Sequence, residues 1–139
     1  MKEPIWLTRQ VVLAVQEELL ARFGGMSGLR DDTLLESALN RPLHAFHYGV
    51  SDLFELAADY AFGIVKNHPF LDGNKRAGFM AAYVFLGANG SDLIAPEEEA
   101  VLQTLALAAV EIGRDDYAAW LRASCPPKAR SSARRQNSS

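Results

Sequence analysis

The residues whose types and spacing could perform chemistry are concentrated in one nine-residue stretch, HPFLDGNKR, at positions 68–76. This stretch holds a histidine, an aspartate, an asparagine and two cations, whereas the residues on either side are mostly apolar. A histidine titrates near neutrality and can accept the proton of an attacking hydroxyl group. His68 is therefore the candidate general base of a catalytic site.

The second half of the stretch has the composition of a phosphate-binding loop. Gly73 permits a backbone bend, and Asn74 is a good N-cap residue, so we expect a helix to begin at or beside it. The first N–H groups of a helix and its dipole attract anions, above all phosphates. Lys75 and Arg76 would lie in the first turn, where cations are unfavourable unless an anion lies between them. These four residues are therefore expected to bind the phosphates of a nucleotide.

Asp72 predicts a metal ion at the same place, because a carboxylate beside bound phosphates is the usual way to hold Mg²⁺. No GxxxxGK[ST] string occurs, so the stretch is not a P-loop. Pro69 prevents His68 and Asp72 from sharing a helical face as a zinc pair, and the single cysteine is remote in sequence. The alternative is an ordinary helix connection with two exposed cations. For the whole string we favour the functional interpretation.

Two helices must position this stretch. Pro69 disfavours helical geometry at His68, so the preceding helix, which Asp52 opens, should end there. The following helix should run through the apolar residues AGFMAAYVFLGA to Asn89 and Gly90. We therefore expect the motif to lie in a loop between two core helices.

Further helices should pack around this pair. One begins after Thr8, and another is capped by Asp31 or Asp32 and stops before Pro42, which leaves residues 41–51 as an exposed connection. A fifth helix starts at Pro96 and ends at Gly113, and a sixth spans about residues 115–123. The inward row of the fifth is predicted to be Val101, Leu102, Leu105, Ala108 and Ile112. The fold class is all-α, a compact bundle of about six helices.

The charged residues are unevenly distributed along the chain. The 14 residues after Cys125, PPKARSSARRQNSS, hold four of the 14 cations and none of the 17 acidic residues. Residues 1–125 therefore carry ten cations and a formal net charge of −7. We expect residues 1–125 to form one domain and the basic tail at 126–139 to be a disordered, solvated end. The acidic domain argues against direct binding of nucleic acid.

The sequence shows no signal for secretion or membrane insertion. The first ten residues, MKEPIWLTRQ, lack the apolar core of a secretory signal. The longest uncharged apolar run, at residues 77–88, has 12 residues and is too short to span a bilayer. The single cysteine excludes an internal disulfide and fits a reducing compartment. We expect a cytoplasmic protein without a membrane partner.

The nine residues resemble the signature of the Fic/Doc (Fido) superfamily, His-x-Phe-x-(Asp/Glu)-(Gly/Ala)-Asn-(Gly/Lys)-Arg. The similarity extends through GLRDDTLLESALNRP at 28–42, the run from DLFELAADYAFGIVKN to AGFMAA at 52–82, and YVFLGANG at 83–90. These segments look like the death-on-curing branch of the superfamily. The resemblance covers roughly residues 1–123.

The resemblance implies an all-α Fido fold and the transfer of a phosphate-containing group from ATP to a protein hydroxyl. By motif position, His68 is the general base, Phe70 packs the loop into the core, and Asp72 binds Mg²⁺. The residues that cradle the nucleotide phosphates are then the next four, Gly73, Asn74, Lys75 and Arg76. Residues 41–51 lie where the family has a flap that aligns the target peptide by strand-like pairing.

Two positions depart from the pattern of AMP-transferring Fic proteins and agree with death-on-curing toxins. The second glycine of GNGR is Lys75 in this chain, and the further arginine three residues after Arg76 is Phe79. The resemblance therefore implies a toxin kinase that acts on translation elongation factor Tu and arrests translation. Gly73 and Pro69 follow the Fic form, which keeps a protein adenylyltransferase as the alternative.

The implied partners are a protein substrate and an antitoxin. The inhibitory (Ser/Thr)-x-x-x-Glu-(Gly/Asn) string of self-restrained Fic proteins is absent from the sequence, so restraint would come from a separate antitoxin. A third possibility, from another class of function, is a catalytically inactive domain that binds an antitoxin or acts as a co-repressor. The intact motif argues against it.

Overall fold

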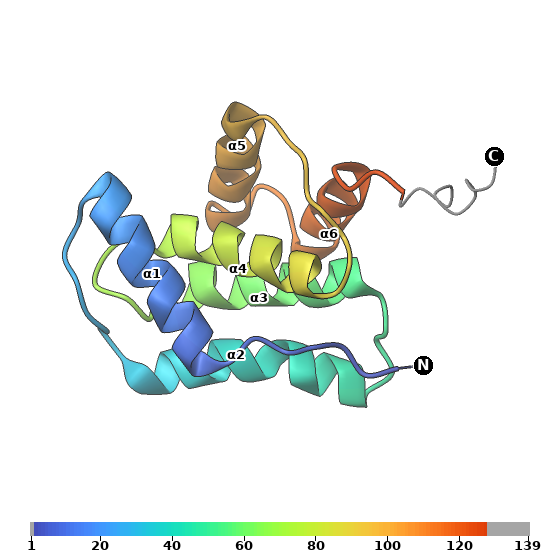
Figure 1. Cartoon of the computed structure of the whole chain (residues 1–139), viewed down its shortest axis with the longest axis horizontal. Helices are drawn as coiled ribbons and strands as arrows, with labels where there is room; N and C mark the ends of the chain where they lie inside the picture. Colours follow the sequence, from blue (N-terminus) through green and yellow to red (C-terminus); the bar gives the residue numbers. More distant parts are fainter. Residues whose placement is uncertain (1, 128–139) are drawn as a thin grey trace.

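The computed structural model describes residues 2–127, and within them the chain forms six α-helices. The helices are α1 (Arg9–Phe23), α2 (Asp32–His47), α3 (Leu53–Asn67), α4 (Asn74–Ala88), α5 (Glu97–Ala108) and α6 (Arg114–Ala123). The pair α3 and α4 forms the centre, with α2 on one side and α5 and α6 on the other (Figure 1). The predicted all-α fold is confirmed. Most of the predicted tail lies outside the described residues.

Helix α3 is the most buried element and leads directly into the motif. Nine of its 15 residues are buried. It begins at the predicted cap, Asp52, whose side chain accepts hydrogen bonds from the N–H groups of Phe54 and Glu55. It ends at Asn67, as the proline at position 69 predicted.

Within the described residues, no helix is both long and apolar enough to cross a membrane.

The two central helices approach each other closely at Gly78. A Cβ atom at this position would lie 2.7 Å from Cγ2 of Val65 and 3.1 Å from the carbonyl oxygen of Ala61. Any larger residue would therefore push the helices apart. Because Gly78 is near the start of α4 and Val65 near the end of α3, this contact holds the two helix ends that flank the motif loop in register.

The predicted end of the second helix is wrong, because α2 continues through Pro42 to His47. Proline removes one backbone donor, which leaves the carbonyl of Ala38 without its helical partner. Tertiary packing outweighs this cost: Pro42 is fully buried, and Phe46 in the next turn contacts Trp6 edge-on, with 5.5 Å between ring centroids. The exposed connection is therefore only residues 48–52, and residues 41–47 cannot provide a strand-like flap.

The predicted inward face of the fifth helix is also wrong. Val101, Leu102 and Leu105 are exposed, whereas the buried residues of α5 are Ala100, Thr104 and Leu107. Apolar residues surround most of this helix, so their spacing does not define one face. The face is selected instead by a buried contact of 2.8 Å between the hydroxyl groups of Thr104 and Tyr117.

Helix α5 ends earlier than predicted, at Ala108 and not at Gly113. Val110 adopts a left-handed backbone with φ of 59°, which is unusual for a β-branched residue and stops the helix. The N–H of Glu111 then donates to the carbonyl oxygen of Ala106 at 2.9 Å and closes the turn. No glycine or proline marks this turn in the sequence, so the helix end was not visible there.

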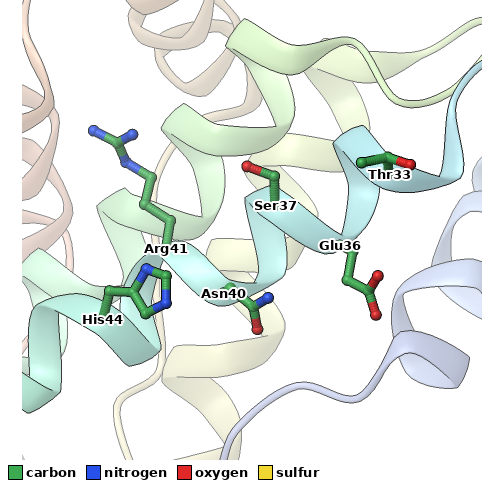
Figure 2. Close-up of a pocket in the computed structure, with 6 residues that line it drawn as sticks. All are labelled: Thr33, Glu36, Ser37, Asn40, Arg41 and His44. Carbon is green, nitrogen blue, oxygen red and sulfur yellow. The ribbon is translucent and has the colours of Figure 1, made fainter.

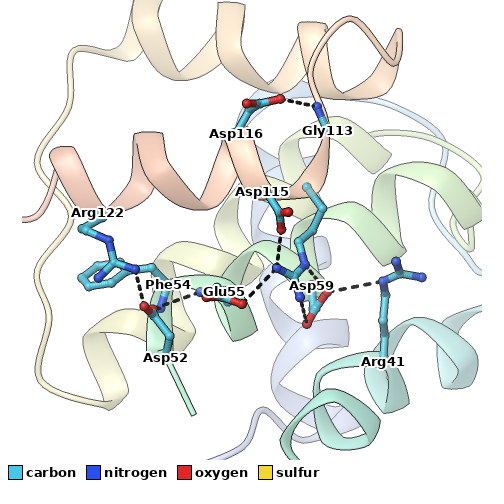
Figure 3. Close-up of polar contacts among 10 residues, drawn as sticks. Arg41, Asp52, Phe54, Glu55, Asp59, Gly113, Asp115, Asp116 and Arg122 are labelled. Atoms are coloured by element: carbon cyan, nitrogen blue, oxygen red, sulfur yellow. Dashed lines mark hydrogen bonds and ion pairs between the residues drawn. The ribbon is translucent and has the colours of Figure 1, made fainter. Parts of the chain in front are cut away.

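A network of charged side chains connects α2, α3 and α6 (Figure 3). Its centre is Asp59, which is 2% exposed and lies 2.9 Å from Nε of Arg114 and 3.5 Å from Nε of Arg41. Arg114 also pairs with Glu55 and Asp115. Burial raises the pKa of Asp59, and the two arginines offset that effect only in part. We call these five residues the Asp59 network.

Candidate active site

The motif loop, residues 68–73, connects α3 to α4 and turns its polar side chains outward. His68 ends α3 in the left-handed conformation, with φ of 51° and ψ of 56°. Phe70 is 1% exposed and anchors the loop in the core. Gly73, with φ of 75°, is the N-cap residue of α4. His68 and Asp72 are both exposed, so the loop presents an imidazole and a carboxylate to solvent, while Phe70 anchors it in the core.

The side chain of Asn74 is buried beneath this loop and holds it in shape. Its Oδ1 accepts the N–H of Phe70, and its Nδ2 donates to the carbonyl of the same residue, both at 3.0 Å. These two bonds fix the orientation of the amide group. Its Nδ2 also lies 3.4 Å from Nδ1 of His68. Because an amide nitrogen only donates, Nδ1 is the acceptor, and the neutral imidazole carries its basic lone pair there.

Lys75 and Arg76 are both exposed in the first turn of α4, where the structure places no acidic residue. The guanidinium of Arg76 lies over the ring of Phe23 at 4.2 Å, a cation–π contact with the last residue of α1. Neither cation forms an ion pair with any residue in the described range 2–127. The first turn of α4 therefore carries two exposed cations without an ion-pair partner, and Asp72 directly precedes its N-cap residue.

Asp72 is held by hydrogen bonds from three segments of the chain. Its Oδ1 accepts the N–H of Gly73 at 3.0 Å, and its Oδ2 accepts the N–H of Met26 at 3.3 Å. Its backbone carbonyl accepts Nε2 of Gln16, on α1, at 2.7 Å. Each carboxylate oxygen keeps a further lone pair, so the group remains able to bind a cation.

The motif and the helices that precede it match the sequence model of a known protein family. The sequence model of the Fic/DOC family matches residues 6–86, which is more than half of the chain. The chain belongs to the Fic/DOC family. Among similar proteins is one named protein kinase doc, from Escherichia phage P1, which is 31% identical over 117 residues covering 84% of this chain and 92% of that protein. Another, named toxin Doc, from Mycolicibacterium smegmatis, is 42% identical over 76 residues covering 52% of this chain and 58% of that protein.

The Fic/DOC motif depends on a segment that the sequence did not indicate, residues 28–31. The N–H of Leu71 donates to the carbonyl of Gly28, and the N–H of Arg30 donates to that of Pro69. The side chain of Arg30 donates to the carbonyls of His68 at 2.7 Å and of Asn67 at 2.9 Å. These bonds tie the loop to the connection between α1 and α2. Because they join residues about 40 positions apart, no local pattern could have predicted them.

Asp72 is the predicted metal-binding residue of the Fic/DOC site. Within residues 2–127 there is no group of three or more His, Cys, Asp or Glu residues that could hold a metal ion. Asp72 is exposed, and the positive start of α4 that would attract phosphates follows it directly. One carboxylate beside phosphate oxygens and water fits Mg²⁺, which keeps most of its water.

A hollow in this Fic/DOC protein lies away from the motif. A shallow depression of about 440 Å³ runs along the exposed face of α2 (Figure 2). Its lining residues are Thr33, Glu36, Ser37, Asn40, Arg41 and His44. None of the predicted site residues lines it. The six predicted residues lie within positions 68–76, and the side chains of His68, Asp72, Lys75 and Arg76 among them are exposed.

Proposed function

We propose that this protein is a toxin that uses ATP and Mg²⁺ to phosphorylate a hydroxyl group of another protein. The observation that supports this proposal best is the set of uncompensated charges at the motif. Asp72, Lys75 and Arg76 form no ion pair with any described residue, although they lie within five positions of one another in the sequence. A nucleotide with its metal ion would supply the missing charge of both signs.

In the proposed reaction, the imidazole of His68 removes the proton of the target hydroxyl. The hydroxyl oxygen then forms a bond to the γ-phosphorus of ATP, while the bond from that phosphorus to the β,γ-bridging oxygen breaks. ADP leaves with that electron pair, and the proton stays on the imidazolium until it passes to solvent. The contact from Asn74 to Nδ1 orients the imidazole ring.

The phosphate cradle would consist mainly of backbone groups. The side-chain amide of Asn74 is occupied by Phe70 and His68, so this residue can offer a phosphate only its N–H. The N–H groups of Lys75 and Arg76 are also among the first of α4 and have no partner within the helix. The side chains of Lys75 and Arg76 would add charge around the phosphates. A bound Mg²⁺ on Asp72 would neutralise charge on the phosphate oxygens.

Two features favour transfer of the γ-phosphate over transfer of AMP. Lys75 occupies a position that is glycine in the AMP-transferring pattern, so its side chain would take up space and add charge beside the inner phosphates. Phe79 stands where that pattern has an arginine, and its ring packs 6.2 Å from that of Trp120 and 6.3 Å from that of Tyr83. An aromatic residue in that cluster cannot contact a phosphate.

The proposed target is translation elongation factor Tu, and the proposed restraint is a separate antitoxin. The names of two similar proteins, protein kinase doc and toxin Doc, support a toxin with kinase activity. The site is open at the surface, which suits a macromolecular substrate and leaves room for an antitoxin to cover it. The protein would act in the cytoplasm, where it would meet both partners.

The test is to incubate the protein and Mg²⁺ with purified elongation factor Tu, using ATP labelled either at the γ-phosphate or at the α-phosphate. We expect label from γ-labelled ATP alone. Transfer of α-label would replace the kinase by the adenylyltransferase. Transfer of neither label, with elongation factor Tu or in a whole-cell lysate, would favour an inactive antitoxin-binding or co-repressor module.

A further inference from the structure

Gln16 is an unusual residue in α1, because it is polar and yet only 2% exposed. Its Nε2 donates to the backbone carbonyl of Asp72 at 2.7 Å. Its Oε1 is buried and has no hydrogen-bond partner among the described residues. Since only the NH₂ group can donate to a carbonyl, the amide orientation is fixed and the unpaired atom is the oxygen. An unpaired buried acceptor costs about 1–3 kcal/mol of folding free energy.

The amide at this position therefore gains one hydrogen bond, to the carbonyl of Asp72, and leaves one acceptor unpaired. Residue 16 lies beneath the turn formed by Asp72 and Gly73: a Cβ atom at Gly73 would be 3.5 Å from Nε2 of Gln16. The one hydrogen bond that Gln16 makes goes to the residue that carries the candidate metal-binding carboxylate.

The turn that follows α1 contacts the side chain of Asp72. The N–H of Met26 donates to Oδ2 of Asp72. The backbone of Gly25 passes so close that a Cβ atom there would lie 3.1 Å from Oδ2 and 3.0 Å from Cδ2 of Leu20. Helix α1 and its C-terminal turn thus fix Asp72 at its backbone carbonyl and at its carboxylate.

We propose that Gln16 is a positioning residue that sets the Asp72 carboxylate for binding of Mg²⁺ together with ATP. It acts through the backbone of Asp72 and does not touch the nucleotide. This inference rests on the proposed function, because it concerns the same site. Groups that orient a metal ligand typically contribute 10- to 100-fold in metal affinity, even though they do not contact the metal.

The test compares full-length wild-type protein with Gln16→Met, which keeps the length of the side chain but removes the amide. The matched control is Gln10→Met, the same change at an exposed position of α1. Calorimetry would measure ATP binding at a series of Mg²⁺ concentrations, and thermal melting would measure stability. For Gln16→Met we expect the Mg²⁺ concentration that gives half-maximal ATP affinity to rise about tenfold. Its melting temperature should change little, because loss of the hydrogen bond to Asp72 and removal of the unpaired oxygen act in opposite directions.

Transfer of γ-label gives a second measurement with the same variants. The rate of Gln16→Met at saturating Mg²⁺ should approach that of wild type, and the deficit should appear only at low Mg²⁺. If Gln16→Met does not unfold cooperatively, Gln16→Asn replaces it, because that amide is one methylene too short to reach the carbonyl of Asp72. The expectation for its Mg²⁺ requirement is the same.

Two outcomes would contradict the inference. One is a folded Gln16→Met with the Mg²⁺ requirement of wild type. The other is a loss of affinity that is equal at every Mg²⁺ concentration, which would indicate a structural role alone. Wild-type protein that binds no ATP and transfers no label at any Mg²⁺ concentration is a different result, because it would overturn the proposed function itself together with this inference.

Discussion

The motif loop and the Asp59 network are two polar clusters attached to the same helix, α3, and they differ in whether their charged side chains form ion pairs. In the Asp59 network every charged side chain has a partner of opposite sign, and the central carboxylate is buried. In the motif loop and the first turn of α4 the charged side chains Asp72, Lys75 and Arg76 are exposed, and none of them forms an ion pair with another described residue. The backbone of the loop, in contrast, is firmly hydrogen-bonded.

This difference is the one expected between a structural cluster and a candidate binding site. Breaking a buried charge pair is costly, because it leaves the remaining charge buried without a partner. Charges that are held in fixed positions without partners contribute nothing to the fold, and the two cations are even opposed by the dipole of α4. A rigid backbone with uncompensated side chains is the arrangement expected of a preorganised binding site.

The largest effect should come from the motif, in the rate of transfer and not in stability. His68→Ala should reduce transfer of γ-label by about 10²- to 10⁴-fold, because it removes the proposed base. The melting temperature should not fall, since the ring is exposed and its one hydrogen bond, at 3.4 Å, is long. Rate assays and thermal melts of the same preparation check this. Full activity in a folded variant would show that another group removes the proton.

The Asp59 network should show the reverse, a loss of stability. Arg114→Ala leaves Asp59 buried, with only Arg41 at 3.5 Å as a partner, and should cost about 3 kcal/mol of unfolding free energy. Urea unfolding measures this. The control is Arg122→Ala, which removes an exposed ion pair with Asp52 and should cost about 1 kcal/mol or less. Equal losses in both variants would mean that burial does not distinguish the two pairs.

Two acids of α3 should respond to pH in opposite directions. Burial would raise the pKa of Asp52, but Arg122 and two backbone N–H groups lower it overall, whereas the pKa of Asp59 is raised. A lowered folded-state pKa gives stability that is present above the unfolded value and lost in acid. A raised one gives a contribution that is fully present in acid and declines as pH rises through the unfolded value towards the folded one.

Substitution by asparagine tests this difference. Asp52→Asn should therefore cost more stability at pH 7 than at pH 2, and Asp59→Asn should cost less at pH 7 than at pH 2. Melting temperatures of both variants and wild type across this range provide the measurement. If both costs changed with pH in the same direction, the opposite pKa shifts of the two carboxylates would be refuted.

The smallest effect concerns a single exposed cation. Lys75→Ala should raise the unfolding free energy by about 0.3–1 kcal/mol, because the lysine opposes the dipole at the start of α4 without an ion-pair partner. ATP affinity should fall in the same variant. The control is Lys66→Ala, in the last turn of α3, where a cation is favourable and its removal should lower stability by a similar amount. Urea unfolding and calorimetry check both; a Lys75→Ala variant less stable than wild type would argue for a structural contact.

Local signals in the sequence were enough to locate the motif and the helices beside it. Pro69 predicted the end of α3, and the caps Thr8, Asp31 and Asp52 marked helix starts that the structure confirms. A proline ring or a capping side chain acts on backbone groups within a few residues of itself, so its effect can be read from the chain alone.

Local signals failed where packing between distant segments decided the result. Pro42 should have ended α2, but burial of the following turn against Trp6 carries the helix past it. The apolar residues of α5 fit several faces, and the contact between Thr104 and Tyr117 selects one. In both cases a contact between segments far apart in the chain outweighs a local preference of a few kcal/mol or less.

The sequence by itself determined the chemistry of the site, because the types and order of residues 68–76 specify a base, a carboxylate and two cations at a bend between helices. Only the tertiary structure decided how that bend is held. The amide of Gln16, the N–H of Met26 and the side chain of Arg30 come from segments at least 37 residues earlier in the chain, and they reach the loop because α1 packs on α4. Their hydrogen bonds depend on distances that exist only once the helices have packed, so no spacing within the sequence could have indicated them.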